Sequence, residues 1–200
     1  MKLRLALVTS ALLATLPAAF ADSCFPTTRV LTANDRFTLE AKMDSKLAFQ
    51  RPSPGTPPQN YWSYTLTEKA TGKTQTGNIP QLASHAHPHL FLSGDGAQFA
   101  VLDDHAETRY ENRVLIFLTN GKLIASLGVT DILNKDELSS VRRSVNHLTW
   151  LGFDPTTWDR ETRTYDIYSK MNNTITLTTP SMRKVAISLT SGKLVSPIGK

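Results

Sequence analysis

The chain has 200 residues, a single cysteine and a formal net charge of +5, with 22 Lys and Arg against 17 Asp and Glu. Lys2 and Arg4 supply two of those charges, and the other basic residues are scattered. The basic stripe typical of nucleic-acid binding is therefore missing, and we expect no nucleic-acid partner. Cys24 cannot form an internal disulfide, which excludes a small secreted domain held together by disulfides.

The first 21 residues predict an export signal. A positive start is followed by an apolar run over residues 5–16, then by Pro17 and Ala19-Phe20-Ala21, which supplies the small residues that signal peptidase reads. The apolar run is shorter than the ~20 residues that span a bilayer. We therefore expect cleavage after Ala21, a periplasmic or secreted protein, and no membrane span in the mature chain.

Strand patterns dominate the rest of the chain, with residues 22–35 expected as a flexible segment ahead of a single β domain over 36–200. Apolar and polar residues alternate through Arg36–Ala41 and Tyr61–Thr67. Between them, Arg51–Gln59 holds four prolines and predicts an extended surface loop, because proline fixes φ and lacks an amide donor. Further strands are expected at 74–79, 90–92, 98–102, 113–118, 122–127, 147–151, 164–169, 174–179, 184–189 and 193–195.

One phrase occurs twice at a constant offset of 71 residues, from position 114 to position 185. Residues 114–126 read VLIFLTNGKLIAS and residues 185–196 read VAISLTSGKLVS, each a strand, a glycine turn and a second strand. Asn120-Gly121 favours a type I′ hairpin turn because both residues tolerate positive φ. Repeated hairpins predict repeated β architecture. Lys122 and Lys193, which follow the glycines, are expected to be solvent-facing turn residues.

One short helix is expected to interrupt the strands. Asn134 can cap it, and Glu137 three residues later completes a capping box. Leu138, Val141 and Val145 fall at helical spacing and predict a buried stripe.

The order of elements between Pro88 and Leu127 resembles a four-stranded blade of a β-propeller: strand, Gly-Asp-Gly turn, strand, polar loop, strand, Asn-Gly-Lys turn, strand. Residues 147–197 contain a looser unit, and Leu39–Ile79 an imperfect one with its own Thr-Gly-Lys turn. The resemblance is to blade repeats in small exported bacterial proteins of uncharacterised function. Propellers close with four to eight blades, and this chain has room for about three. We therefore expect an all-β, hairpin-rich antiparallel meander, built as a sandwich or as partial-propeller-like sheets, with one short helix.

The sharpest cluster of reactive side chains is His85-Ala86-His87-Pro88-His89, whose three imidazoles could share one face of an extended chain. A hairpin around Ser93–Gly96 would bring this run close to Asp103 and His105. Imidazoles with a carboxylate suit Zn²⁺ or Cu²⁺ and would allow a metal-dependent hydrolase. No spacing such as H-E-x-x-H accompanies them, so solvated histidines are the competing interpretation.

Motifs of enzyme nucleophiles are weak. Ser181-Met182-Arg183-Lys184 matches S-x-x-K, but the S-D-N and K-T-G elements of penicillin-recognising enzymes are absent, and the motif lies between two predicted strands. Nucleophile elbows, P-loops and Rossmann fingerprints are also absent from the sequence. A non-enzymatic protein is therefore favoured over an enzyme.

Aromatic residues beside loops provide the main binding hypothesis. Tyr61 follows the proline loop that starts at Arg51, and Trp158 lies in a turn-rich segment, whereas Trp62 and Trp150 are expected in the core. Exposed aromatic rings stack on sugars and anchor peptides. The sequence thus predicts an exported interaction or ligand-binding module that contacts a protein, peptide or carbohydrate through Trp158, Tyr61 and Arg51. Two alternatives remain: a metal protein based on the histidine run, and a subunit that pairs an open sheet edge with another chain.

Overall fold

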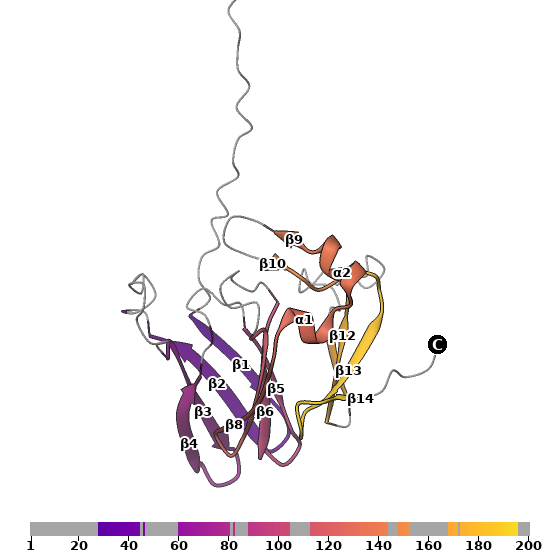
Figure 1. Ribbon diagram of the computed structural model, residues 1–200. Coiled ribbons are helices and arrows are strands. Elements are labelled where there is room, and N and C mark those ends of the chain that lie inside the picture. Colours follow the sequence, from indigo (N-terminus) through magenta and orange to yellow (C-terminus); the bar gives the residue numbers. More distant parts are fainter. Residues whose placement is uncertain are drawn as a thin grey trace, which may run out of the picture.

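The computed structural model describes residues 28–44, 46, 60–80, 82, 88–104, 113–143, 148–152, 168–171 and 173–195. Within these ranges the chain consists mainly of antiparallel β-sheet with two short helices (Figure 1). None of the helices in the described ranges is both long and apolar enough to cross a membrane. The predicted fold class, an all-β hairpin-rich antiparallel meander, is confirmed.

Each of the three large sheets is a meander of four strands in chain order. The first sheet contains β1 (Arg29–Ala33), β2 (Phe37–Met43), β3 (Trp62–Glu68) and β4 (Thr74–Ile79). The middle sheet contains β5 (Pro88–Leu92), β6 (Gln98–Asp103), β7 (Leu115–Thr119) and β8 (Lys122–Leu127). The last sheet contains β11 (Tyr168–Met171), β12 (Thr174–Thr178), β13 (Lys184–Ser188) and β14 (Leu194–Val195).

The segment between the middle and last sheets holds the helices, α1 (Val129–Ile132) and α2 (Lys135–Ser140). A two-stranded ribbon of β9 (Arg142–Arg143) and β10 (Leu148–Thr149) follows them. Figure 1 shows the helices and the ribbon together at one end of the stacked sheets. The helix expected at Asn134 is α2, and the one-turn helix α1 directly precedes it.

Strands β5, β6 and β7 of the middle sheet are buried on both faces, whereas the edge strand β8 is largely exposed. Phe99 and Val101 of β6 belong to the core shared with the first sheet, whereas Ala100 and Leu102 belong to the core shared with the last sheet and the helices. These three strands are therefore nearly continuous apolar runs, as strands covered on both sides are. The three sheets stack face to face as one packed unit, with the middle sheet between two cores.

The first sheet ends the stack with a polar outer face. Trp62, Tyr64 and Leu66 of β3 are buried, as the alternation predicted, while Ser63 and Thr65 alternate with them and are exposed or half-buried. One-sided burial explains why this strand alternates where the strands of the middle sheet do not.

The repeated phrase forms the β7–β8 and β13–β14 hairpins, but their turns differ. Asn120 (φ 47°) and Gly121 (φ 77°) form the expected two-residue turn. In the second copy Ser191 stands in place of Asn120, and only Gly192 has a positive φ, of 65°. The turn is then longer, with the Gly192 amide donating to the Ser188 carbonyl at 2.8 Å. Serine adopts positive φ far less readily than asparagine, so one residue changes the turn of an ungapped repeat.

Three hairpin turns contain a glycine followed by a lysine, and two of these glycines, Gly121 and Gly192, lie against a neighbouring sheet. A Cβ atom on Gly121 would lie 2.2 Å from the Tyr64 hydroxyl oxygen of the first sheet, and one on Gly192 would lie 2.4 Å from the Cβ of Ala125 in the middle sheet. Gly72, in the β3–β4 turn, has φ 69° but nothing within 4 Å. Each of these turns therefore packs against the sheet that precedes its own in the chain: the Gly121 turn on the first sheet and the Gly192 turn on the middle sheet. The Gly72 turn belongs to the first of the described sheets and has no such contact.

Two details of the predicted elements differ from the structure. β1 begins at Arg29 and pairs with β2, ahead of residue 36, where the β domain was expected to start. The predicted apolar stripe is confirmed in part: Val141 is buried in the core and the half-buried Leu138 packs against it, but α2 ends at Ser140, before Val141. The most deeply buried side chain of α2 is the charged Glu137, which is 2% exposed. Val145 lies outside the described residues.

Candidate functional site

Most residues predicted to form a binding surface or metal site lie outside the described residues, namely Arg51, His85, His87, His105 and Trp158. Tyr61 is described and is only 3% exposed, in the core between the first and middle sheets. It is therefore a core residue rather than an exposed aromatic platform. Trp62 and Trp150 are buried, as predicted.

Two members of the predicted metal site, His89 and Asp103, lie among the described residues, on the paired strands β5 and β6. His89 Nε2 lies 3.0 Å from Asp104 Oδ2 at the open end of the β5–β6 hairpin. Asp103 is buried, with 2% exposed, and its backbone carbonyl accepts a hydrogen bond from Trp150 Nε1 at 2.8 Å. The described residues contain no group of three or more His, Cys, Asp or Glu side chains placed to hold a metal ion.

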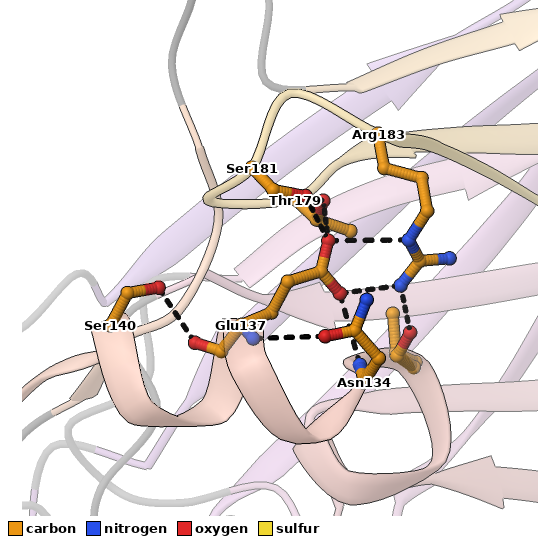
Figure 2. A network of polar contacts seen from close by, with 7 residues as sticks. Asn134, Glu137, Ser140, Thr179, Ser181 and Arg183 are labelled. Atoms are coloured by element: carbon orange, nitrogen blue, oxygen red, sulfur yellow. Dashed lines mark hydrogen bonds and ion pairs between the residues drawn. The ribbon is translucent and has the colours of Figure 1, made fainter.

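A cluster of polar side chains surrounds the buried carboxylate of Glu137 (Figure 2). Its carboxylate oxygen Oε2 accepts a hydrogen bond from the Asn134 amide at 3.0 Å, and Asn134 Oδ1 accepts one from the Glu137 amide at 2.9 Å. This is the capping box that the sequence predicted, and it satisfies two amides at the start of α2.

The same carboxylate also binds the turn between β12 and β13. Arg183 donates from Nε to Oε1 at 3.2 Å and from Nη2 to Oε2 at 2.5 Å, a two-pronged contact. The hydroxyls of Thr179 and Ser181 both donate to Oε1. Arg183 Nη2 also donates to the carbonyl of Ile132, the last residue of α1, at 2.9 Å. We call this cluster the Glu137 clamp; it consists of Asn134, Glu137, Thr179, Ser181 and Arg183.

The clamp holds its carboxylate ionised. Burial by itself raises the pKa of Glu137, but hydrogen bonds from Arg183, Ser181, Thr179 and the Asn134 amide outweigh it and lower the pKa to about 2. Such a carboxylate is a poor general base near neutral pH, where catalysis favours a pKa close to the working pH. The geometry therefore assigns Glu137 to joining helices and sheet.

The S-x-x-K match has a structural explanation. Ser181 donates to the clamp, whereas Lys184 Nζ donates to Thr178 Oγ1 at 2.6 Å, so the two motif residues serve different partners. Met182 between them has φ 66°, and its amide donates to the Thr179 carbonyl at 2.8 Å in a tight turn. The motif residues form a strand-to-strand turn and not an acyl-enzyme site.

We expect stability to fall in acid through this one carboxylate. The pKa of Glu137 is about 2 in the folded protein against an ordinary value of 4.5. Its contribution is thus complete above about pH 4.5 and is lost as the pH falls toward about 2, a difference of about 3 kcal/mol. Urea unfolding measured between pH 7 and pH 2 should show this loss in the wild-type protein. Glu137→Gln should lack that component, and identical pH dependence in the two proteins would contradict the expectation.

A hollow of about 320 Å³ adjoins the clamp. Its lining comes from α2, the ribbon, the segment after the ribbon and the β12–β13 turn, and consists of Ser140, Arg142, Thr149, Leu151, Gly152 and Pro180. Ser140 Oγ donates to the Glu137 carbonyl at 2.8 Å, and Pro180 lies between two clamp residues. A Cβ atom on Gly152 would lie 2.0 Å from the Thr179 carbonyl oxygen, so only glycine fits there. The clamp therefore ties together two segments that line the hollow, the end of α2 and the β12–β13 turn.

Among the described residues of that lining, Arg142 is the one that carries a charge. Its side chain is exposed, and within the described ranges its guanidinium forms no hydrogen bond or ion pair. The hydroxyls of Ser140 and Thr149 and the apolar side chains of Leu151 and Pro180 complete the hollow. A free guanidinium beside hydroxyls and apolar walls suits an anionic group attached to an apolar body.

Neither a family model nor a curated protein matches this chain. The fold and the site define its class: an all-β scaffold of stacked four-stranded meanders, with a buried ionic clamp that joins two short helices to the last sheet.

Proposed function

We propose that the protein is an exported, non-enzymatic binding module that holds an anionic group of its ligand in the hollow beside the Glu137 clamp. The observation that supports this is the contrast between two arginines. Arg183 is engaged by Glu137, whereas Arg142 lines a hollow with fixed walls and lacks a partner among the described residues. Sites built on rigid elements bind with little loss of conformational entropy.

The ligand is a protein, peptide or carbohydrate that carries a carboxylate or a similar anion. A non-enzymatic role agrees with the clamp, because both carboxylate oxygens of Glu137 and the hydroxyls of Thr179 and Ser181 are occupied by hydrogen bonds within the protein. The order of strands within each sheet further supports a likeness to propeller blades.

Titration with hexanoate, followed by NMR, tests the hollow. Chemical shifts of Thr149 and Leu151 should move with hexanoate and much less with 1-hexanol, because only the carboxylate pairs with Arg142. Arg142→Gln should weaken hexanoate binding about tenfold, as expected for a charge-assisted hydrogen bond. Arg143→Gln, a neighbour on β9 outside the lining, is the matched control and should change little. Equal responses to acid and alcohol, or equal losses in the two variants, would refute the site.

Export is proposed from residues 1–21. The N-terminal sequence of the protein recovered from producing cells should then start at Asp22. A protein that keeps Met1 would argue against export.

The contact between His89 and Asp104 favours a second candidate, a Zn²⁺- or Cu²⁺-binding protein. Elemental analysis of purified protein and its melting temperature with added Zn²⁺ test this candidate. Metal at one ion per chain that is lost in His89→Gln would support it. An absence of metal together with an unchanged melting temperature would remove it.

A further inference from the structure

Another cavity, of about 290 Å³, lies between the first and middle sheets. Its walls come from three hairpin turns, which join β3 to β4, β5 to β6 and β7 to β8, and from the adjoining ends of strands in the first sheet. Strand β8 runs from one of these turns toward α1, so the cavity lies at the end of the sheets opposite the helices (Figure 1). It is therefore separate from the hollow beside the Glu137 clamp.

The turns around this cavity are held by contacts within the protein. The Asn120 amide donates to the Ala97 carbonyl at 2.8 Å, which ties the β7–β8 turn to the β5–β6 turn. Gly96 of the β5–β6 turn lies on the ring of Phe37 at the start of β2, where an added Cβ would come within 2.9 Å of three ring atoms. The walls are therefore in place before a ligand arrives, which lowers the entropy cost of binding.

Apolar side chains form one part of the lining, and the position of a glutamine shows where the cavity opens. Phe37 and Leu66 belong to the core between the first and middle sheets. Gln75 of β4 is paired with Leu66, so both lie on the face of the first sheet that is turned toward the middle sheet. Gln75 is nevertheless exposed, with its Nε2 donating to the Tyr64 hydroxyl at 3.3 Å. The cavity is thus open to solvent at the edge strand β4.

Several polar groups of the lining keep unused hydrogen-bonding capacity. Asp95 Oδ1 accepts from the Ser93 hydroxyl at 2.6 Å and from the Ala97 amide at 3.0 Å, and these bonds lower the pKa of Asp95. Its other oxygen, Oδ2, accepts no hydrogen bond from the described residues. The Lys73 ammonium and the Asn120 side chain also form no hydrogen bond or ion pair within the described ranges.

The charges around the cavity balance. Glu68 also lines it, but its Oε1 lies 3.7 Å from Arg36 Nη2 and its Oε2 accepts from the Thr71 hydroxyl at 2.8 Å. Among the charged residues of the described lining, this leaves Lys73 and Asp95, which have opposite signs. A ligand with a net charge of either sign therefore meets one attractive and one repulsive group.

We propose that this cavity binds a neutral sugar ring. A sugar hydroxyl both donates and accepts, so it can accept from Lys73 and donate to Asp95 Oδ2. The amides of Gln75 and Asn120 can do both in turn. The C–H groups of the ring suit the apolar part of the lining, and the volume lies at the lower end of ligand pockets, at about 300 Å³. This site is independent of the hollow and of the anion proposed there.

NMR titration with four sugars tests the cavity: D-glucose, D-galactose, D-mannose and N-acetyl-D-glucosamine. The amide shifts of Ala97 and Asn120 should move with at least one of them, with a dissociation constant of about 1–10 mM. Cyclohexanol offers an apolar ring with one hydroxyl, and glycine offers both charges without a hydroxyl. Both should cause much smaller shifts at the same concentration.

Two variants probe the polar groups separately. Asp95→Asn keeps an oxygen for the bonds from Ser93 and Ala97 but turns the free oxygen into a donor, and Lys73→Gln removes the ammonium. Each should weaken binding of the preferred sugar about tenfold, the loss expected for a hydrogen bond to a charged group. Lys193→Gln changes the lysine at the same place in the β13–β14 turn, away from the cavity, and should leave binding unchanged.

Circular dichroism should show the β-sheet retained in all three variants, and Lys73 has no hydrogen bond of its own to lose among the described residues. An absence of shifts with all four sugars, equal shifts with cyclohexanol, or unchanged affinity in Lys73→Gln would overturn the inference. Tight binding of glycine that both Asp95→Asn and Lys73→Gln abolish would also overturn it, by assigning the cavity to a zwitterion.

Discussion

Replacing Glu137 by Gln should lower the free energy of unfolding by about 1.5–3 kcal/mol, the loss typical of a hydrogen bond to a charged group, because the carboxylate is buried while Arg183 is 40% exposed. Glutamine keeps the shape of the side chain but removes the charge. Its NH2 group would face hydrogen-bond donors, because both carboxylate oxygens of Glu137 accept hydrogen bonds. Arg183 then loses its counter-ion, and α2 loses part of its cap. Urea denaturation at pH 7 measures the change.

Asp136→Asn is the matched control for this prediction. Asp136 lies one residue earlier in the same first turn of α2 but is exposed, so its removal should cost less than about 1 kcal/mol. Combining Glu137→Gln with Arg183→Gln should cost clearly less than the sum of the two single changes, because both remove the same contact. Additive costs, or equal costs for Glu137 and Asp136, would mean that the clamp does not act as a unit.

Gly192→Ala should destabilise the protein much more than Gly72→Ala. The two glycines have φ of 65° and 69° and turns with the same amide-to-carbonyl hydrogen bond, at 2.8 Å in each. Alanine in the left-handed region costs about 1–2 kcal/mol at either position. At Gly192 the new methyl group also meets Ala125, and overpacking adds about 1–3 kcal/mol.

The free energy of unfolding lost in Gly192→Ala, minus the loss in Gly72→Ala, measures how the turn of the last sheet packs on the middle sheet. Gly121→Ala offers a second example, because its Cβ would meet the Tyr64 hydroxyl in the first sheet. Circular dichroism should show the β-sheet retained in all three variants. If Gly72→Ala and Gly192→Ala cost the same, the turn glycines would not be the points of contact between sheets.

Local signals in the sequence were sufficient to place most strands and turns. Alternation located β2 and β3, and the Asp-Gly and Asn-Gly pairs located hairpins in the middle sheet. The cap of α2 followed from Asn134 and Glu137, which lie three residues apart. These features depend on neighbours within one hairpin or one helical turn, so the information needed lies in a few consecutive residues.

The candidate sites depended on distant parts of the chain. Glu137 could be read as a helix cap, but its contacts to Thr179 and Arg183 join residues 42 and 46 positions apart. Tyr61 could be read as a loop aromatic, but packing of the first sheet on the middle sheet buries it. No periodicity encodes such contacts.

Local patterns in the sequence were enough to predict an all-β chain of hairpins with a capped short helix and a repeated phrase. That this repeat steps from one sheet to the next, and that Glu137 joins helix and sheet, followed only from the way the sheets pack. The reason is physical: hydrogen-bonded turns and strands form between neighbours in the chain, whereas burial and ion pairing depend on which surfaces come together when the sheets stack.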